Sequence, residues 1–360
     1  MNAETSRPAD RPQSAYARAG VDIEAGDRAV ALMKDSVARS SRPEVMGGIG
    51  GFAGLFDASA LARYRHPVLA TSTDGVGTKV AIAQAMDRHD TIGFDLVGML
   101  VDDLVVCGAE PLFVTDYIAC GRVVPERIAA IVDGIARACR ATGAALLGGE
   151  TAEHPGLLGP DEYDIAGATT GVVEADALLG PDRVRAGDVV VAMASSGLHS
   201  NGYSLVRQVL LTEAGWALDR EVAELGRDLG SELLEPTRLY ALDALALIDA
   251  VEVHAMSHIT GGGFANNLAR VLPDGLAATI ERGSWQPAPI FGLVQQVGGV
   301  SQADLEATLN MGVGMAVVVA PEAADEAVRF LMSRDVPAWV CGEVRDAAQG
   351  SPRAELVGVH

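Results

Sequence analysis

Strand-like and helix-like apolar patterns alternate along this chain of 360 residues, and the alternation restricts the fold more than any other feature. Strands are expected at 68–71, 112–119, 144–147, 164–173, 189–194 and 313–319. Two amphipathic helices lie among the first of them, one beginning after Asp90 and one running from Pro125 to about Gly143. Such alternation predicts an α/β (α+β) protein.

The stretch 174–188 is rich in turn residues and is the best candidate for a domain boundary. At roughly 100–200 residues per domain, the chain is long enough for about two domains. We therefore expect an N-terminal domain over 15–175 and a C-terminal α/β domain over 176–350. Residues 1–14 are polar and lack the apolar stretch of a signal peptide, so a disordered tail is expected there.

The chain is strongly acidic, with 48 Asp and Glu against 27 Lys and Arg and a formal net charge of −21. A protein that binds the nucleic-acid backbone needs a basic surface, so nucleic acid is excluded as a partner. No uncharged apolar run approaches the ~18 residues that a membrane helix requires. The four cysteines form no Cys-x-x-Cys pair, which fits a reducing compartment. We expect a cytoplasmic protein with no membrane partner.

Lys34 and Lys79 are the only lysines, and every other basic residue is Arg. A chain that keeps lysine at two positions is expected to need a compact ammonium group there. The alternative is a codon bias that left two lysines by chance.

Asp74 stands in the sequence TDGVGTK, residues 73–79, directly after a predicted strand. Two glycines would let the backbone approach a phosphate closely, and the Lys79 ammonium would neutralise part of its charge. The spacing is not that of a P-loop, which requires Gly-x4-Gly-Lys-Ser/Thr. The alternative is an ordinary solvated glycine turn.

Two further acidic positions are candidates for a metal site. Asp102 and Asp103 lie near the C-terminal end of their predicted helix, where the helix dipole disfavours an acid by about 0.3–1 kcal/mol and a bound cation would reverse that sign. Glu150 follows a predicted strand and two glycines. Asp74, Asp103 and Glu150 offer the oxygen ligands that suit Mg²⁺ bound with nucleotide phosphates, provided that they converge. The alternative for the aspartate pair is a surface acid pair.

Two more glycine-rich segments are candidates for phosphate contacts. The segment GGIGGF at 47–52 would be a mobile cover over phosphates or merely a flexible loop. The segment 195–202 connects a strand to a helix, so that backbone N–H groups are aimed at an anion. Within it Ser200 and Asn201 add donors, and His199 is a candidate acid–base group or phosphate contact, the alternative being a structural histidine. The other histidines show no metal-ligand pairing.

Seven motifs occur in order over about residues 15–345. They are YARAGVDIE at 16–24, RPEVMGGIGGF at 42–52, TDGVGTK at 73–79, DLVVCGAEP at 103–111, GGETAE at 148–153, GLHSNGYSLVR at 197–207 and ITGGGF at 259–264. Together they resemble the phosphoribosylformylglycinamidine cyclo-ligase family, also called aminoimidazole ribonucleotide synthetases. The Asp103-x4-Gly108-x2-Pro111 pattern is shared by a wider superfamily of ATP-using proteins, whereas RPEVMGGIGGF and HSNGYSLVR are more specific.

The resemblance implies two mixed α/β domains, with the N-terminal domain forming a shared β-barrel in a homodimer and active sites in clefts between the domains. It also implies a reaction of purine biosynthesis that converts formylglycinamidine ribonucleotide and ATP into 5-aminoimidazole ribonucleotide, ADP and phosphate. The expected ligands are therefore a small phosphoribosyl substrate, ATP and Mg²⁺.

Site roles are carried over from the matching motifs. The catalytic candidates are His199, Lys79 and Lys34. The ATP-binding candidates are Gly47, Gly48, Gly50, Gly51, Phe52, Asp74, Gly75, Thr78, Lys79, Asp103, Glu150 and Thr151. The metal candidates are Asp74, Asp103 and Glu150, and the substrate-binding candidates are His199, Ser200, Asn201 and Gly202. Asp102 departs from the family, in which a polar and often amide side chain is expected at this position. This difference would either alter the affinity for the metal or have no effect on it.

Other members of the superfamily are the competing interpretations. A selenophosphate synthetase is expected to carry a reactive cysteine near its N-terminus, whereas the first cysteine here is Cys107. A hydrogenase-maturation protein of the same fold uses a C-terminal cysteine, whereas this chain ends in LVGVH. A thiamine monophosphate kinase is the remaining alternative.

Overall fold

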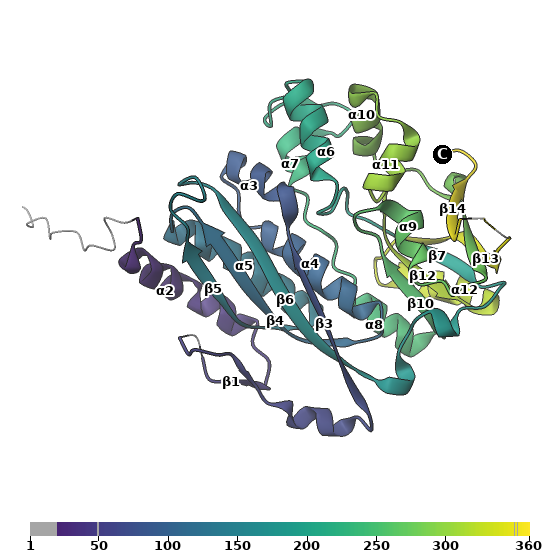
Figure 1. Ribbon diagram of the computed structural model, residues 1–360, viewed down its shortest axis with the longest axis horizontal. Coiled ribbons are helices and arrows are strands. Elements are labelled where there is room, and N and C mark those ends of the chain that lie inside the picture. Colours follow the sequence, from purple (N-terminus) through teal and green to yellow (C-terminus); the bar gives the residue numbers. More distant parts are fainter. Residues whose placement is uncertain (1–19, 49, 349, 351) are drawn as a thin grey trace, which may run out of the picture.

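The computed structural model describes residues 20–48, 50–348, 350 and 352–360. The tail expected over 1–14 and the start of the YARAGVDIE motif lie outside the described residues. Two main β-sheets, each with its own helices, lie on opposite sides of the molecule (Figure 1). Among the described residues, no helix combines the length and the apolar character needed to cross a membrane. The α/β (α+β) class expected from the alternating pattern is confirmed.

The N-terminal sheet has four strands in the order β3-β6-β4-β5. They are β3 (Pro67–Gly75), β4 (Glu110–Cys120), β5 (Ala145–Glu153) and β6 (Tyr163–Glu174). Strand β6 pairs antiparallel with β3 and β4, whereas β4 and β5 run parallel and are joined by a helical crossover. The strand expected at 144–147 is longer in the structure. Residues 148–151, which were expected to follow the strand, belong to β5 itself.

Helices α4 (Ile92–Val105) and α5 (Pro125–Thr142) cover one face of this sheet (Figure 1). Helix α5 begins with proline and ends at Gly143, whose φ of 77° places it in the left-handed region, as the sequence predicts. Helix α4 begins one residue later than expected, with Thr91 rather than Asp90 at its N-cap. The opposite face of the sheet is exposed at Leu69, Thr71, Thr73 and Tyr117.

The remaining elements before the domain connection are short or lie at the edge of the sheet. They are α2 (Ile23–Arg39), β1 (Val45–Met46), β2 (Leu55–Phe56), η1 (Ala58–Arg63), η2 (Gly77–Lys79) and α3 (Val80–Met86). Helix α2 packs along α5, and two 3₁₀ turns, η3 (Ala175–Ala177) and η4 (Pro181–Arg183), occupy the connection to the second sheet.

The C-terminal sheet has six strands in the order β10-β12-β7-β13-β11-β14. They are β7 (Val189–Ala194), β10 (Val253–His258), β11 (Leu276–Glu281), β12 (Val313–Val319), β13 (Ala338–Asp346) and β14 (Ala354–Val357). Strands β7 and β12 match the predicted ranges, whereas β11 and β14 were not anticipated. A two-stranded hairpin of β8 (Glu221–Val222) and β9 (Arg227–Asp228) is separate from this sheet.

Short helices surround the C-terminal sheet. They are α6 (Tyr203–Val206), the π-helical turn η5 (Arg207–Glu213), α7 (Leu229–Leu233), α8 (Ala241–Ala250), α9 (Gly263–Ala269), η6 (Arg282–Ser284), α10 (Pro289–Gly298), α11 (Gln302–Thr308), η7 (Pro321–Ala323) and α12 (Ala324–Ser333). Helix α8 also packs against α4 and α5. One continuous apolar core therefore runs from the N-terminal helices into the C-terminal half.

Candidate active site

A cleft opens between the end of β3 and the turn that follows β7. Its cavity measures about 330 Å³ and is lined by Asp74, Gly75, Val76, Gly77, Met99, Asp164, Ile165, Ala166, Ser200 and Asn201. We name this cavity the interdomain cleft, because the last two residues come from the C-terminal half and the others from the N-terminal half.

Three ionisable side chains gather beside the interdomain cleft. His258, the last residue of β10, is buried, and its Nδ1 lies 2.9 Å from Oδ1 of Asp103 on α4. Burial lowers the pKa of His258, but its bond to Asp103 and the charges of the nearby acids outweigh burial, so the pKa lies above the usual value. Burial and then the charge of Asp103 raise the pKa of Asp74, while His258 opposes the rise. The structure therefore brings Asp74 and Asp103 together and adds a histidine.

The neighbouring Asp102 is fully buried. Its Oδ1 accepts a hydrogen bond of 3.0 Å from the backbone N–H of Tyr240, while its Oδ2 has no hydrogen-bond partner among the described residues. Burial raises the pKa of Asp102 to about 7, against the opposing charge of His258. The alternative of a surface acid pair therefore does not hold for Asp102, although the neighbouring Asp103 is exposed.

The turn 195–202 holds His199 in an unusual conformation. Its backbone φ is +61°, a left-handed value that non-glycine residues rarely adopt. Its ring Nε2 accepts a hydrogen bond of 3.1 Å from the backbone N–H of Ser196, and Oγ of the next residue, Ser200, donates to the Val76 carbonyl at 2.7 Å. A Cβ on Gly314 would lie only 2.6 Å from the His199 ring, so the glycine provides the space that the ring occupies. The hydrogen bond to the His199 ring, the hydrogen bond of Ser200 and the space left by Gly314 therefore fix the position of His199.

The environment of His199 keeps its ring neutral. Burial lowers its pKa well below the usual value, and the nearby positive charges of His258, Lys79 and Arg238 lower it further. Because Nε2 accepts a hydrogen bond, the proton of the neutral ring is assigned to Nδ1. This Nδ1 is buried without a hydrogen-bond partner among the described residues, and His199 itself lines neither the interdomain cleft nor the pocket in the N-terminal domain.

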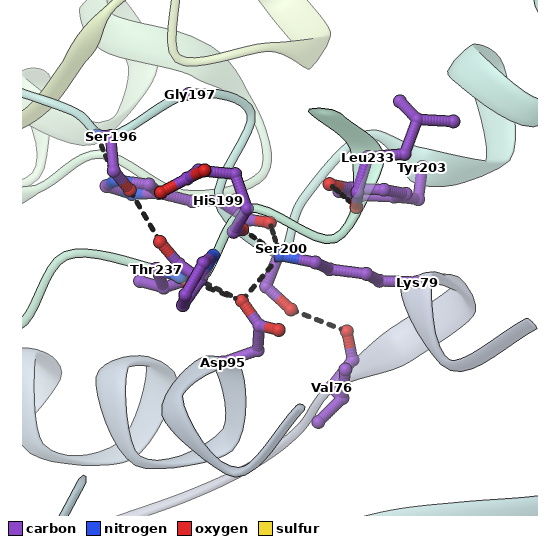
Figure 2. Close-up of polar contacts among 12 residues, drawn as sticks. Val76, Lys79, Asp95, Ser196, Gly197, His199, Ser200, Tyr203, Leu233 and Thr237 are labelled. Carbon is purple, nitrogen blue, oxygen red and sulfur yellow. Dashed lines mark hydrogen bonds and ion pairs between the residues drawn. The ribbon is translucent and has the colours of Figure 1, made fainter. Parts of the chain in front are cut away.

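Lys79 is buried in the protein and does not line the interdomain cleft. Its Nζ lies 2.7 Å from Oδ1 of Asp95, 2.9 Å from the carbonyl oxygen of His199 and 2.6 Å from that of Glu235 (Figure 2). All three ammonium protons therefore have acceptors within the chain. In this arrangement the lysine binds protein groups rather than a phosphate.

A second pocket lies within the N-terminal domain alone. It measures about 440 Å³, and its lining includes Gly48, Gly50, Gly51, Phe52, Asp116, Gly148, Gly149, Glu150 and Thr151. We name it the glycine pocket. Its remaining walls come mainly from α2, β4 and β5. The phenyl ring of Phe52 is fully exposed at its rim, and residue 49 of the predicted cover lies outside the described residues.

The structure does not bring Glu150 to Asp74 and Asp103. Strands β6 and β4 lie between β3, which carries Asp74, and β5, which carries Glu150. At a strand spacing of ~4.8 Å, three strand intervals separate the two carboxylates by about 14 Å. Within the parts of the chain that the structure describes, no three His, Cys, Asp or Glu side chains are arranged to hold a metal ion. The predicted triad therefore does not converge within one chain.

The other predicted residues line neither pocket. Lys34 is exposed on α2 and borders Val30 and Val37 of the glycine pocket, which are one helical turn away. Thr78 is exposed, and its Oγ1 lies 3.1 Å from Oγ of Ser204. Gly47 and Gly202 have positive φ values of 82° and 77° and supply turns at the edges of the two cavities.

Sequence reasoning missed several residues of the site. His258 was set aside, yet it directly precedes the ITGGGF motif and ends a strand, a position that could have identified it. Asp95 stands on the apolar face of α4 between Ile92 and Leu96, and a carboxylate in such a place signals a buried partner.

Comparisons with known proteins agree over nearly the whole chain. The family model of AIR synthase related proteins matches with its N-terminal domain at residues 56–173 and with its C-terminal domain at residues 185–354. A phosphoribosylformylglycinamidine cyclo-ligase of Geobacillus thermodenitrificans (strain NG80-2) is 52% identical over 334 residues, which are 93% of this chain and 96% of the relative. One of Brevibacillus brevis is 51% identical over 331 residues, covering 92% and 95%.

Solved structures share the fold at lower identity. A thiamine-monophosphate kinase from Stenotrophomonas maltophilia K279a matches with a TM-score of 0.67 and 20% identity, over 91% of this chain and 96% of that one. A hydrogenase maturation protein of E. coli matches with a TM-score of 0.64 and 19% identity, over 92% and 93%. At such identities the likeness concerns the fold alone.

Proposed function

The chain belongs to the phosphoribosylformylglycinamidine cyclo-ligase family, and from this membership we propose that it closes the imidazole ring of 5-aminoimidazole ribonucleotide. The substrates are formylglycinamidine ribonucleotide and ATP, and the other products are ADP and phosphate. The reaction forms a C–N bond and belongs to purine biosynthesis, for which we propose a cytoplasmic location.

The observation that carries this proposal is the composition of the interdomain cleft. Asp74 stands at one wall with Asp103 and His258 close by, and Ser200 and Asn201 form the other wall. Carboxylates suit a metal–phosphate group, whereas the Asn201 amide can donate to phosphate and amide oxygens of a substrate. The Ser200 hydroxyl already donates to the Val76 carbonyl, so towards a substrate its oxygen would act as an acceptor. One cavity therefore offers the two kinds of group that an ATP-dependent ring closure requires.

The chemistry explains why ATP is needed. Ring closure must remove the formyl oxygen of an amide, which is a poor leaving group. Transfer of the γ-phosphoryl group of ATP to this oxygen gives an imidate phosphate and ADP. A substrate nitrogen then attacks the same carbon, phosphate leaves with the oxygen, and the nitrogen loses a proton. Catalysis of phosphoryl transfer depends mainly on positioning and on stabilising negative charge.

Residues of the turn 195–202 would position the substrate. The neutral His199 would not act as an acid, because burial and neighbouring positive charges keep its pKa low. Its Nδ1 would donate to the substrate only after a movement of the turn, because the ring is buried and does not line the cleft. Ser200 and Asn201 would contact the substrate phosphate or the reacting amidine from the cleft wall. Gly202 would supply the turn that presents them.

Asp74 and Asp103 would hold Mg²⁺. The donor set fits, because carboxylate oxygens are preferred ligands of this ion and the charge of Asp103 already raises the pKa of Asp74, a repulsion that a cation would relieve. Two protein carboxylates are enough, since Mg²⁺ usually keeps waters and phosphate oxygens as its other ligands. The ion would neutralise the phosphate charge of ATP.

The glycine pocket and the exposed sheet face support two further parts of the proposal. Gly48, Gly50, Gly51, Glu150 and Thr151 would contact ATP at the glycine pocket, with Lys34 at its border. Because this pocket lies about 14 Å from Asp74, these contacts would be to a part of the nucleotide other than the phosphates that Mg²⁺ neutralises. The exposed sheet face would pair with the same face of a second copy, because Leu69 on it is 60% exposed. Light scattering of the purified protein tests the homodimer, and the mass of a single chain would exclude it.

ADP release measured with and without formylglycinamidine ribonucleotide tests the activity. We expect ADP to appear only when this substrate is present, in a one-to-one ratio with 5-aminoimidazole ribonucleotide followed by mass spectrometry. ATP hydrolysis that is independent of the substrate, or ADP without the ring-closed product, would reject the function.

A further inference from the structure

We propose that Lys79 is a positioning residue, which together with Asp95 holds the turn 195–202 in its working shape across the junction of the two domains. The role rests on the function proposed above, because that turn carries the groups that would bind the substrate.

The Lys79 side chain connects three separate parts of the chain. Asp95 lies on α4 of the N-terminal domain, whereas the His199 and Glu235 carbonyls belong to two different segments of the C-terminal half (Figure 2). The side chains of Lys79 and Asp95 are both completely buried. The aromatic ring of Tyr203 lies 5.4 Å from Nζ and gives the ammonium a fourth favourable neighbour. No water is needed to satisfy this charge.

Asp95 extends the same connection to the segment 235–238. Its Oδ1 accepts hydrogen bonds from the backbone N–H of Thr237 at 3.0 Å and from the Thr237 hydroxyl at 2.7 Å. The hydroxyl of Ser196 then joins this segment to the turn, because it donates to the Pro236 carbonyl at 2.7 Å and accepts from the Arg238 N–H at 3.1 Å. The turn is therefore fixed at Ser196 and at His199 by one connected network (Figure 2).

His199 is the residue that depends most on this network. Its left-handed backbone is unfavourable and persists only where surrounding contacts enforce it. The Lys79 ammonium bonds to its carbonyl, the Ser196 N–H bonds to its ring, and the hydroxyl of Ser200 bonds to the Val76 carbonyl. Removing the ammonium would leave the buried His199 carbonyl and the partly buried Glu235 carbonyl without their donor, and a flip of the His199 peptide would relieve the penalty at the first of them. Such a flip would also move the Ser200 and Asn201 groups in the cleft.

A phosphate contact explains the same lysine less well. Its three protons are already donated, and the side chain has no exposed surface through which a phosphate would reach it. The notable scarcity of lysine in this sequence fits the geometry, because a compact ammonium places three donors around one atom, whereas a planar guanidinium does not.

A set of three variants tests the role. Lys79→Met keeps the length of the side chain and removes the charge, Asp95→Asn removes the partner charge, and the double variant removes both. We expect Lys79→Met to lower kcat by about 10- to 100-fold with less than about a 3-fold change in the KM for ATP, because misplacement of the turn affects positioning. The double variant should recover melting temperature, since no uncompensated buried charge remains, but not kcat.

Arg282→Met is the matched control. Arg282 forms a largely buried ion pair with Glu306 that lines neither pocket, so its loss should lower the melting temperature and leave kcat unchanged. The same result for Lys79→Met would show a purely structural lysine and overturn the proposal. A KM for ATP raised 10-fold or more with kcat preserved would overturn it in favour of a phosphate contact.

Hydrogen exchange of the turn 195–202 supplies a readout that does not need activity. We expect faster exchange of its amides in Lys79→Met than in the wild type, and wild-type rates in Arg282→Met. Unchanged exchange in Lys79→Met would overturn the positioning role. If the wild type makes no ring-closed product, the proposed function is rejected. If the amides of the turn nevertheless exchange faster in Lys79→Met than in the wild type, the link between Lys79 and the turn still holds.

Discussion

The interdomain cleft and the glycine pocket differ in how their charged groups are stabilised. Beside the cleft, Asp103 is paired with His258 and the buried Lys79 with Asp95. Asp102 is the exception there, because its Oδ2 has no hydrogen-bond partner among the described residues and burial raises its pKa to about 7. In the glycine pocket Asp116 is buried enough for its pKa to rise to about 7, opposed only by its own backbone amide. The first site therefore holds two paired sets of charges before a ligand arrives, whereas only a backbone amide stabilises the Asp116 charge in the second.

The same contrast holds for the backbone. The cleft wall is fixed by hydrogen bonds across the domain junction and by close packing, so that a Cβ on Gly314 would come within 2.0 Å of the Tyr240 hydroxyl. In the glycine pocket, a Cβ on Gly48, Gly50 or Gly148 would meet no atom within 4 Å, whereas a Cβ on Gly149 would lie 1.5 Å from Oδ1 of Asp116. We interpret the cleft as the pre-organised site and only the part of the glycine pocket around Gly48, Gly50 and Gly148 as having room to adapt.

The largest effect is expected from Asp103→Asn, which removes a charge from the cleft without changing the shape of the side chain. Turnover should fall by about 100-fold or more, because charge stabilisation in phosphoryl transfer is lost. The pKa of His258, followed by NMR, should fall, since its bond to the Asp103 carboxylate is a cause of its raised value. The melting temperature should change little, because Asp103 is exposed. Wild-type turnover together with an unchanged His258 pKa would remove Asp103 from the site.

An intermediate effect is expected from Gly314→Ala, which tests whether the cleft is rigid. The added methyl group would collide with the Tyr240 hydroxyl and the His199 ring, and overpacking of this kind costs about 1–3 kcal/mol. Chemical denaturation should show this loss, and kcat should fall with it because the His199 ring is displaced.

Gly148→Ala is the matched change in the glycine pocket. It introduces the same methyl group where nothing lies within 4 Å, so the free energy of unfolding should stay within about 0.5 kcal/mol of the wild type. Equal losses in both variants would contradict the distinction between a rigid and an adaptable site.

Much of the fold could be predicted because the relevant signals are local. The apolar runs at 189–194 and 313–319 became β7 and β12 with the expected bounds, and Pro125 and Gly143 marked the ends of α5. Strand β5 was predicted too short, because Gly148 and Gly149 are typical of a turn. In the sheet a Cβ on Gly149 would lie 1.5 Å from Oδ1 of Asp116, so the glycine is required by a neighbour 33 positions earlier in the sequence.

The candidate site was predicted less completely because its contacts span the sequence. Asp74, Ser200 and Asn201 were found from their motifs and do line one cavity. The role of Lys79 depends on a helix, a turn and a segment that lie as far as 156 residues away, and no local pattern places those three acceptors around it. Glu150 carries an acid at a promising strand position, but the order of the strands, which the sequence does not reveal, places it in the other pocket.

Asp116→Asn is expected to have an effect that depends on pH, and it tests the charge in the glycine pocket. Because the folded-state pKa of about 7 lies above the ordinary value of 3.8, the wild type is stabilised by the bound proton at low pH and loses that contribution as pH rises from about 4 to 7. The asparagine variant has no such proton to lose, so its free energy of unfolding should rise relative to that of the wild type over this range. The difference should reach roughly 1–2 kcal/mol at pH 8. This is less than the full pKa shift implies, because solvent reaches part of the side chain. Urea denaturation at pH 5 and pH 8 measures it, with the exposed Asp182→Asn as the control. A difference that stays constant with pH would mean that the pKa of Asp116 is not raised and that its charge is stabilised in the folded protein.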